Sequence, residues 1–270
     1  MAEPTLSQLT EKGARFRALH LGPGAFVIAN AWDAGSARLL RDLKLFPAIA
    51  TSSAAAAMAQ GLRDGQLGRD RSLANARAIV DASDPLPVSA DLENGFGKPP
   101  ATVAETIRLA AAAGLVGASI EDAGEGHGPV YDRSLAIERV AAAVEAARSL
   151  GLPFTLTARA ENFIRERPDL DDTIERLQAY GAAGADVLFA PGLPSIDAVR
   201  EVCAAVTKPV NFMAGIPGRS FSVAELTAAG VRRISLAASL YRAAMGGMVA
   251  AAREVATHGT FTYTDRIWTG

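Results

Sequence analysis

Three carboxylates follow short apolar segments that have the composition of buried strands. Asp91 and Glu93 end the segment Pro87–Glu93, and Glu121 stands near the end of Gly117–Asp122. Asp91 and Glu93 are two residues apart, so on a strand they share one face. Converging acids repel one another unless a cation lies among them, and Mg²⁺ or Mn²⁺ prefers oxygen ligands. We therefore predict a metal site of Asp91, Glu93 and Glu121; the alternative is that arginines pair with these acids.

A fixed positive charge stands at a corresponding position of a later segment. Arg159 lies in Thr157-Ala158-Arg159-Ala160-Glu161, at the end of an apolar run. Its planar guanidinium matches the geometry of a carboxylate, and a cation there can stabilise charge that develops during a reaction. We predict that Arg159 is catalytic and also binds substrate. A salt bridge to Glu121 or Glu161 is the structural alternative, and both roles can hold together.

Small hydroxyl residues end another apolar segment. Thr51, Ser52 and Ser53 precede Ala54 and a loop that reaches Asp64. Exposed backbone N–H groups in such a turn can cradle an anion, for example the carboxylate of a substrate. Ordinary turn chemistry is the alternative.

A glycine-rich segment follows Glu121 and Asp122. Gly124-Glu125-Gly126-His127-Gly128 contains three glycines in five residues, which is typical of a loop that closes over a site. His127 is a candidate for carrying a proton into or out of that site. The alternative is an exposed loop histidine.

Several other chemistries are excluded or disfavoured by the sequence. It contains neither a phosphate-binding G-x-x-x-x-G-K-[ST] motif nor a cysteine and histidine cluster of the zinc type. A Schiff-base mechanism needs a desolvated lysine in the site. The four lysines, Lys12, Lys44, Lys98 and Lys208, are poorly placed for it. A metal-dependent route is therefore preferred.

The elements that must position these residues alternate along the chain. Apolar runs typical of strands buried on both faces are separated by periodic Ala, Leu and Val segments typical of helices. The predicted strands are Phe26–Trp32, Ala48–Ser53, Pro87–Glu93, Gly117–Asp122, Phe154–Ala160, Val187–Pro191, Pro209–Gly215 and Arg232–Ala238. Eight such units predict a closed (β/α)₈ TIM barrel of the α/β class, formed by residues 1–270 as a single domain. An open doubly wound sheet is the competing layout.

Local signals support the helices. Thr102 and Glu105 have the spacing of a capping box. Three helices end in the same way, with alanine and then glycine, and glycine after a helix adopts the left-handed conformation that stops it. The three pairs are Ala113-Gly114, Ala183-Gly184 and Ala229-Gly230.

The composition indicates a soluble cytoplasmic protein. Of the 270 residues, 49% are hydrophobic and 21% are charged, and the net charge is −2. This balance disfavours a nucleic-acid partner, and no run is long and apolar enough to span a membrane. Residues 1–20 lack the apolar region of a secretory signal. The single cysteine, Cys203, cannot form an internal disulfide, which fits a reducing compartment.

Taken in order, these segments resemble the isocitrate lyase/phosphoenolpyruvate mutase superfamily. No single motif decides this, but the ordered set is specific and extends from about residue 26 to about residue 245. The matching stretches are Asn30-Ala31-Trp32-Asp33-Ala34-Gly35-Ser36-Ala37-Arg38, Ala48-Ile49-Ala50-Thr51-Ser52-Ser53, Ser89–Gly97, Ile120-Glu121-Asp122, Thr157-Ala158-Arg159 and Ala183-Gly184-Ala185-Asp186.

The resemblance implies a TIM barrel with its last helix exchanged between subunits, assembled as a dimer or tetramer. It also implies Mg²⁺ and small carboxylic acid substrates related to pyruvate or oxaloacetate. Asp91, Glu93 and Glu121 match acids of the metal shell, although the family more often has Asp at the second place. The predicted substrate-binding set is Trp32, Ser52, Ser53, Ala54, Asp64, Arg159 and Asn211; the catalytic set is Arg159, Glu121 and His127.

Two departures from the family bear on the reaction. The lyases carry a Lys-Lys-Cys-Gly-His type of segment after the fourth strand, and the phosphonate branch has a lysine and an Asn-Ser pair there. Here the segment 124–130 has neither. The hypothesis is cleavage of a C–C bond by a lyase or decarboxylase, because oxaloacetate decarboxylation needs no cysteine. The alternatives are P–C bond chemistry on a phosphonopyruvate-like substrate, or a protein that binds a 2-oxo acid without turnover.

Overall fold

The computed structural model describes residues 5–124 and 128–269. Within them, eight parallel strands close into a barrel in sequential order, and the last strand pairs with the first. The strands are β1 (Phe26–Ala31), β2 (Ile49–Thr51), β3 (Val88–Asp91), β4 (Gly117–Glu121), β5 (Thr155–Arg159), β6 (Val187–Phe189), β7 (Val210–Met213) and β8 (Arg233–Ser235). All eight predicted strands and the TIM-barrel class are confirmed, and each strand lies within its predicted range.

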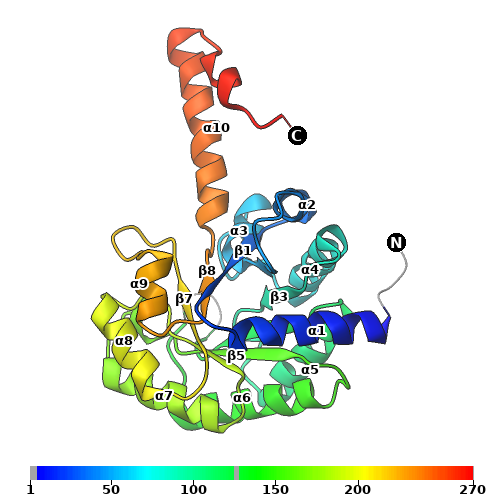
Figure 1. Cartoon of the computed structure of the whole chain (residues 1–270), viewed down its shortest axis with the longest axis vertical. Helices are drawn as coiled ribbons and strands as arrows, with labels where there is room; N and C mark the ends of the chain where they lie inside the picture. Colours follow the sequence, from blue (N-terminus) through cyan, green and yellow to red (C-terminus); the bar gives the residue numbers. More distant parts are fainter. Residues whose placement is uncertain (1–4, 125–127, 270) are drawn as a thin grey trace.

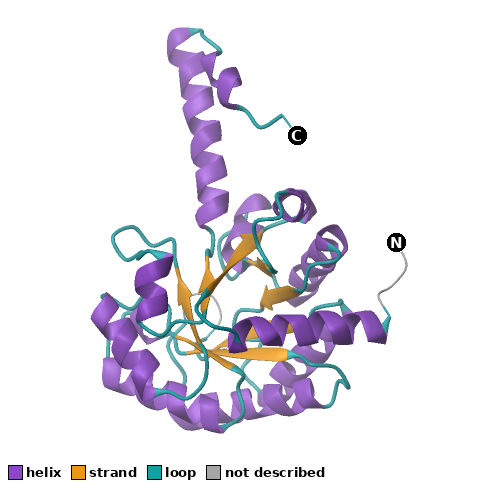
Figure 2. Cartoon of the chain, in the orientation of Figure 1, coloured by secondary structure: helices purple, strands orange, loops and turns teal. Residues whose placement is uncertain are grey.

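Helices surround the barrel (Figures 1 and 2). They are α1 (Leu6–Leu21), α2 (Ala34–Asp42), α3 (Ser53–Ala59), α4 (Arg69–Ser83), α5 (Pro100–Ala112), α6 (Arg133–Arg148), α7 (Leu170–Ala182), α8 (Ile196–Ala205), α9 (Val223–Ala228) and α10 (Ser239–His258), with short 3-10 turns η1 (Asn162–Ile164) and η2 (Thr262–Arg266). The predicted helix stops are confirmed, because Gly114, Gly184 and Gly230 all have positive φ.

The expected capping box of Thr102 and Glu105 is wrong. α5 begins at Pro100, with Pro99 as its N-cap and no side-chain cap. Proline is suited to the first helical position because it lacks the N–H that would have no partner there. The prolines therefore start the helix early, and Thr102 lies inside its first turn.

The two faces of the strands have different compositions. On β4 and β5, the apolar side chains Ala118, Ile120 and Leu156 pack in the core between barrel and helices. The alternating residues Glu121 and Arg159 instead line a cavity inside the barrel. Period-two alternation thus separates an apolar layer, which holds the fold together, from a polar layer available for chemistry.

The amino-terminal end of the barrel is closed by α1. Phe16 is fully buried, and it packs with Ile28 and with Ala48 and Val116, which immediately precede β2 and β4. A side chain at Gly117 would place Cβ 2.9 Å from the Phe16 ring, so the start of β4 requires glycine. We call this end of the barrel the floor.

Two further rings complete the floor. His20 packs edge-on against Phe16 and Phe26, with centroid separations of 4.9 and 5.0 Å. Its Nδ1 lies 2.9 Å from the carbonyl oxygen of Phe16. The floor is therefore made of aromatic rings.

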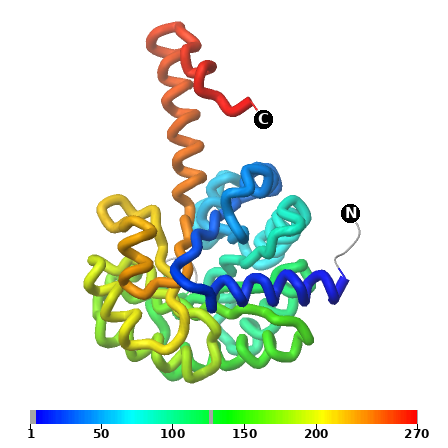
Figure 3. Tube along the Cα trace, viewed as in Figure 1, coloured from blue at the N-terminus to red at the C-terminus, as the bar shows by residue number. Residues whose placement is uncertain are grey.

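The last long helix contacts the barrel only near its start. α10 projects away from it after β8 (Figures 1 and 3), and none of the helix residues is buried. Met248, Val249 and Val255 expose apolar side chains, as do Phe261, Ile267 and Trp268 beyond the helix. An apolar surface of this kind is typical of an interaction site. Across the described residues, no helix combines the length and apolar character needed to cross a membrane.

Candidate active site

A cavity of about 320 Å³ opens at the carboxyl ends of the barrel strands, the end we call the mouth. The final residues of β2 to β8 all contribute to its wall. These residues are Thr51, Asp91, Glu121, Arg159, Phe189, Met213 and Ser235. In TIM barrels the loops and strand ends at this face form the active site. The cavity is therefore the candidate active site.

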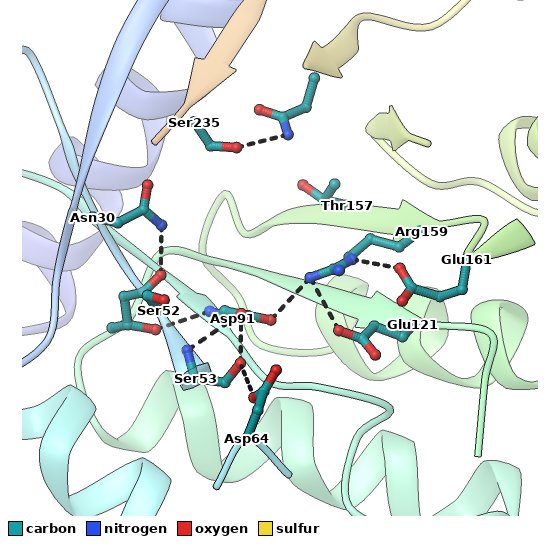
Figure 4. A network of polar contacts seen from close by, with 12 residues as sticks. Asn30, Ser52, Ser53, Asp64, Asp91, Glu121, Thr157, Arg159, Glu161 and Ser235 are labelled. Carbon is teal, nitrogen blue, oxygen red and sulfur yellow. Dashed lines mark hydrogen bonds and ion pairs between the residues drawn. The ribbon is translucent and has the colours of Figure 1, made fainter. Parts of the chain in front are cut away.

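Arg159 stands at the centre of the polar groups in this cavity (Figure 4). Its Nη1 lies 3.2 Å from Asp91 Oδ1 and 3.0 Å from Glu121 Oε1. Its Nε donates to Glu161 Oε1 at 3.0 Å. Burial alone lowers the pKa of Arg159, but the three carboxylates outweigh burial and raise it. Arg159 is therefore a permanent cation, and the predicted structural pairing with Glu121 and Glu161 is present.

A second arginine completes the ionic cluster. Arg165, just after η1, places Nη2 3.1 Å from Glu121 Oε2 and Nε 3.5 Å from Glu161 Oε2. Burial raises the pKa of Glu121 and of Glu161, and both arginines oppose that shift. The two glutamates are thus each held between two guanidinium groups.

The predicted anion-binding turn is the start of α3. Ser52 is the N-cap and accepts a hydrogen bond from the amide of Ala55. The amide and hydroxyl of Ser53 both donate to Asp91 Oδ2, at 3.3 and 2.8 Å. The Ser53 hydroxyl also donates to Asp64 Oδ1, at 3.5 Å. Ser52, Ser53, Ala54 and Asp64 all line the cavity, and the start of a helix favours anions.

Glu93 reaches the cavity in a way that strand alternation did not predict. β3 ends at Asp91, and Glu93 has a φ of 49°, in the left-handed region. Its carbonyl accepts a hydrogen bond from the amide of Glu121 at 2.9 Å. The shared-face argument for Asp91 and Glu93 was wrong, but both residues line the cavity. A non-glycine residue in this conformation is characteristic of functional sites.

The carboxylates have the chemistry of a Mg²⁺ or Mn²⁺ site. No three His, Cys, Asp or Glu side chains in the described ranges form a metal cluster as they stand. Arg159 and Ser53 contact the oxygens of Asp91. Mg²⁺ commonly keeps several waters and uses only one or two protein carboxylates. The donor set of Asp91, Glu93 and Glu121 therefore fits such an ion.

A buried network behind the mouth fixes the position of Glu161. Asp122 Oδ1 accepts from the Glu161 amide at 2.8 Å. Asp122 Oδ2 accepts from the Tyr180 hydroxyl at 2.5 Å and from Arg176 Nη1 at 3.1 Å. Arg176 in turn donates from Nε to Asp172 Oδ2 at 2.8 Å. α7 thereby stabilises the loop that carries Glu161, one of the three acids that contact Arg159.

Three other predicted residues have different outcomes. Asn211 lines the cavity, and its Nδ2 donates to Ser235 Oγ at 3.1 Å. Trp32 is not among the residues that line the cavity; its ring packs edge-on against Tyr241 of α10, with centroids 5.4 Å apart. His127 lies outside the described residues.

Three arginines of the cavity wall were not predicted from the sequence. They are Arg165, Arg233 and Arg242. Arg233 was detectable, because it alternates with Ser235 on β8 and therefore shares the inward face. Arg165 follows β5 in an irregular turn, where no periodicity reveals orientation.

Comparison with known proteins yields consistent matches. The family model described as phosphoenolpyruvate phosphomutase matches residues 16–256. A solved structure from Burkholderia cenocepacia J2315, provisionally described as a lyase/mutase, is 52% identical, with a TM-score of 0.94, and covers 98% of this chain and 94% of its own.

Two curated relatives have named activities. The 2-methylisocitrate lyase of Escherichia coli K12 is 31% identical over 210 residues, which is 75% of this chain and 69% of the relative. The oxaloacetate decarboxylase of Bradyrhizobium diazoefficiens is 30% identical over 198 residues, which is 73% of this chain and 68% of the relative.

Proposed function

Because this chain belongs to the isocitrate lyase/phosphoenolpyruvate mutase superfamily, we propose that it is a divalent-metal-dependent carbon–carbon lyase or decarboxylase. Its substrate is a small 2-oxo or 2-hydroxy di- or tricarboxylic acid, similar to oxaloacetate or 2-methylisocitrate. One observation carries the proposal: a permanently charged arginine, Arg159, is held among three carboxylates at the mouth of the barrel.

Three carboxylates are the proposed metal ligands. Mg²⁺ or Mn²⁺ would be held by Asp91, Glu93 and Glu121, with water completing the shell. Bound there, the ion supplies Lewis-acid stabilisation of negative charge on a substrate oxygen.

The protein side chains orient the substrate and stabilise the developing charge. The start of α3, with Ser52, Ser53 and the amide of Ala54, binds a substrate carboxylate. In the decarboxylase case, the electron pair of the breaking C–C bond of a 2-oxo acid such as oxaloacetate moves onto the 2-oxo oxygen to give an enolate, and CO₂ leaves. Arg159 is preorganised to stabilise that enolate. The enolate carbon then takes a proton from water to give the 2-oxo acid.

The single cysteine takes no part in this proton transfer. Cys203 lies on α8, outside the cavity lining, and burial raises the pKa of its thiol to about 11. Decarboxylation, which needs no protein thiol, is therefore the favoured reaction. For a larger acid, His127 remains the proposed proton donor.

Pyruvate release tests the proposal. We expect release from oxaloacetate, 2-methylisocitrate or a related substituted malate with Mg²⁺, above a background of buffer with Mg²⁺, and its loss in EDTA. Glu121→Gln removes one carboxylate charge and should lower the metal-dependent rate by about 10–100-fold. Glu138→Gln, at an exposed position of α6, is the matched control and should keep full activity.

The opposite results are also informative. Release that persists in EDTA would contradict the metal role, and equal rates in both variants would remove Glu121 from the mechanism. No release from any acid would overturn the lyase proposal. Thermal stabilisation by an acid without product would then indicate a binding protein.

Phosphorus–carbon bond chemistry is the second candidate. It is favoured by the match to a family model described as phosphoenolpyruvate phosphomutase. Cleavage of phosphonopyruvate would yield free phosphate, which a colorimetric assay distinguishes from pyruvate released by a C–C lyase.

We also propose that the chain is a homodimer or homotetramer in which α10 packs against a neighbouring subunit. The support is that no residue of this helix is buried in its own chain. Light scattering should give two or four times the 28.0 kDa chain mass. A monomer at micromolar concentration would contradict this arrangement.

A further inference from the structure

A second buried arginine lies deeper in the same barrel and has no acidic partner among the residues that the structure describes. Arg233, the first residue of β8, is only 5% exposed. Its Nε donates to Asn211 Oδ1 at 2.7 Å, and its Nη2 donates to Thr157 Oγ1 at 3.1 Å. Both partners are neutral. None of the ion pairs found within residues 5–124 and 128–269 involves Arg233.

This environment is unfavourable for a cation. Burial lowers the pKa of Arg233 to about 9, and the positive charge of Arg159 contributes to the lowering. A buried charge is normally paired, because an unpaired one loses its hydration without compensation. Arg159, in contrast, is a buried arginine paired with three carboxylates.

The guanidinium is nevertheless held in a defined orientation. Asn211 accepts from Arg233 and donates to Ser235 at 3.1 Å. Thr157, labelled near Arg159 in Figure 4, accepts a hydrogen bond from the other side of the Arg233 fork. Fixing a planar fork in advance favours recognition of a planar anion with two oxygens.

An anion can reach Arg233 from one side. Arg233 lines the cavity that opens at the mouth. At the floor, Phe26, which pairs with Arg233 between β1 and β8, packs with the rings of Phe16 and His20. The anionic group that pairs with Arg233 must therefore belong to a molecule that enters the cavity.

We propose that Arg233 binds the second carboxylate of the substrate, so that the cavity selects dicarboxylates over monocarboxylates. The inference rests on the proposed function in that it concerns the same cavity and the same acid substrates. One end of the substrate lies at Arg159 and the start of α3, and the distal carboxylate receives the fork of Arg233. Arg233 is thus a specificity residue that does not take part in bond breaking.

Binding of two matched acids tests this role without turnover. Malate and lactate share the 2-hydroxy acid end, and only malate has a distal carboxylate. Their dissociation constants are measured by calorimetry with Mg²⁺ for the wild type and Arg233→Met. We expect malate affinity to fall by about 20-fold or more, as for a desolvated charge pair, and lactate affinity to change less than about threefold.

A neighbouring arginine provides the matched control. Arg232 precedes β8 and is partly exposed, and its charge acts on Cys203 of α8. Arg232→Met removes the same charge one residue away and should leave both affinities unchanged. A second variant, Arg233→Lys, keeps the charge and removes the fork, so malate alone should weaken. If circular dichroism shows that Arg233→Met does not fold, Arg233→Lys replaces it in the test.

Other outcomes separate the two proposals. Unchanged malate affinity in the Arg233 variants, or equal loss for malate and lactate, would overturn the assignment. So would a wild type that binds malate no better than lactate. A wild type that prefers malate through Arg233 but releases no pyruvate would support Arg233 and contradict the lyase.

Discussion

Charged side chains at the mouth of the barrel have partners of opposite charge, and those toward the floor have neutral partners. At the mouth, Arg159 and Arg165 share the carboxylates of Asp91, Glu121 and Glu161. Toward the floor, Arg233 contacts only neutral groups and His20 packs among aromatic rings. Both regions are buried, so burial alone does not explain the difference.

The difference separates charges that are paired within the protein from charges that are not. Mouth charges hold one another in place before any ligand arrives, which is the preorganisation that catalysis requires. The floor groups have no opposite charge beside them in the described part of the chain, so desolvation sets their state. A charge left in this condition indicates either a ligand site, as proposed for Arg233, or a group kept neutral, as for His20.

The largest expected difference is in the free energy of unfolding when Arg159 or Arg233 is replaced. Arg159→Met leaves three carboxylates without their shared cation and should lower the free energy of unfolding by about 3 kcal/mol or more. Arg233→Met leaves only two neutral acceptors without a donor and should cost about 1–2 kcal/mol. Urea unfolding at pH 7 without ligand measures both.

The comparison fails if Arg233→Met destabilises the protein as much as Arg159→Met. That result would mean that Arg233 has a structural role of equal weight. Arg165 still faces Glu121 and Glu161 in the Arg159 variant, which keeps the expected loss at the lower end of the range for broken buried pairs.

A smaller effect is expected from His20 as the pH falls. Burial lowers the pKa of His20 to about 3 from 6.5, and Arg233 contributes to the lowering. The unfolded chain therefore binds more protons than the folded chain between these pH values. The stability that the neutral His20 imidazole contributes is present above pH 6.5 and is lost toward pH 3. Between pH 7 and pH 5 the loss should be about 2 kcal/mol.

Substitution isolates this contribution from that of other titrating groups. His20→Gln should unfold with a shallower dependence of stability on pH than the wild type, because glutamine does not titrate. His258→Gln, at an exposed position near the end of α10, should keep the wild-type dependence. If His20→Gln keeps it as well, the floor does not exclude a charged imidazole.

The barrel was predictable because its signals repeat. Eight apolar runs, separated by helices of which three stop at Ala-Gly, define the order of the strands, and closure follows from their number. The ends of the elements were less predictable. The prolines at 99 and 100 moved the start of α5, and left-handed Glu93 ended the alternation of β3 earlier than expected.

The site was predictable where residues follow strands directly. Asp91, Glu121 and Arg159 were placed at the mouth by strand position alone. Trp32 was placed there by resemblance, and its ring instead packs against Tyr241, because side-chain direction after a strand depends on tertiary contacts. Arg233 was not predicted, because functional groups were expected at strand ends and this residue begins its strand.

The position of α10 links quaternary structure to the site. Ser239 and Arg242, in its first turn, belong to the cavity wall, whereas no residue of the helix is buried among the described residues of its own chain. In the proposed oligomer, the subunit that receives this helix also steadies a wall of its neighbour's cavity. Substrate affinity and subunit association are then thermodynamically coupled. Dilution would weaken substrate binding, and saturating substrate would tighten the assembly by the same factor.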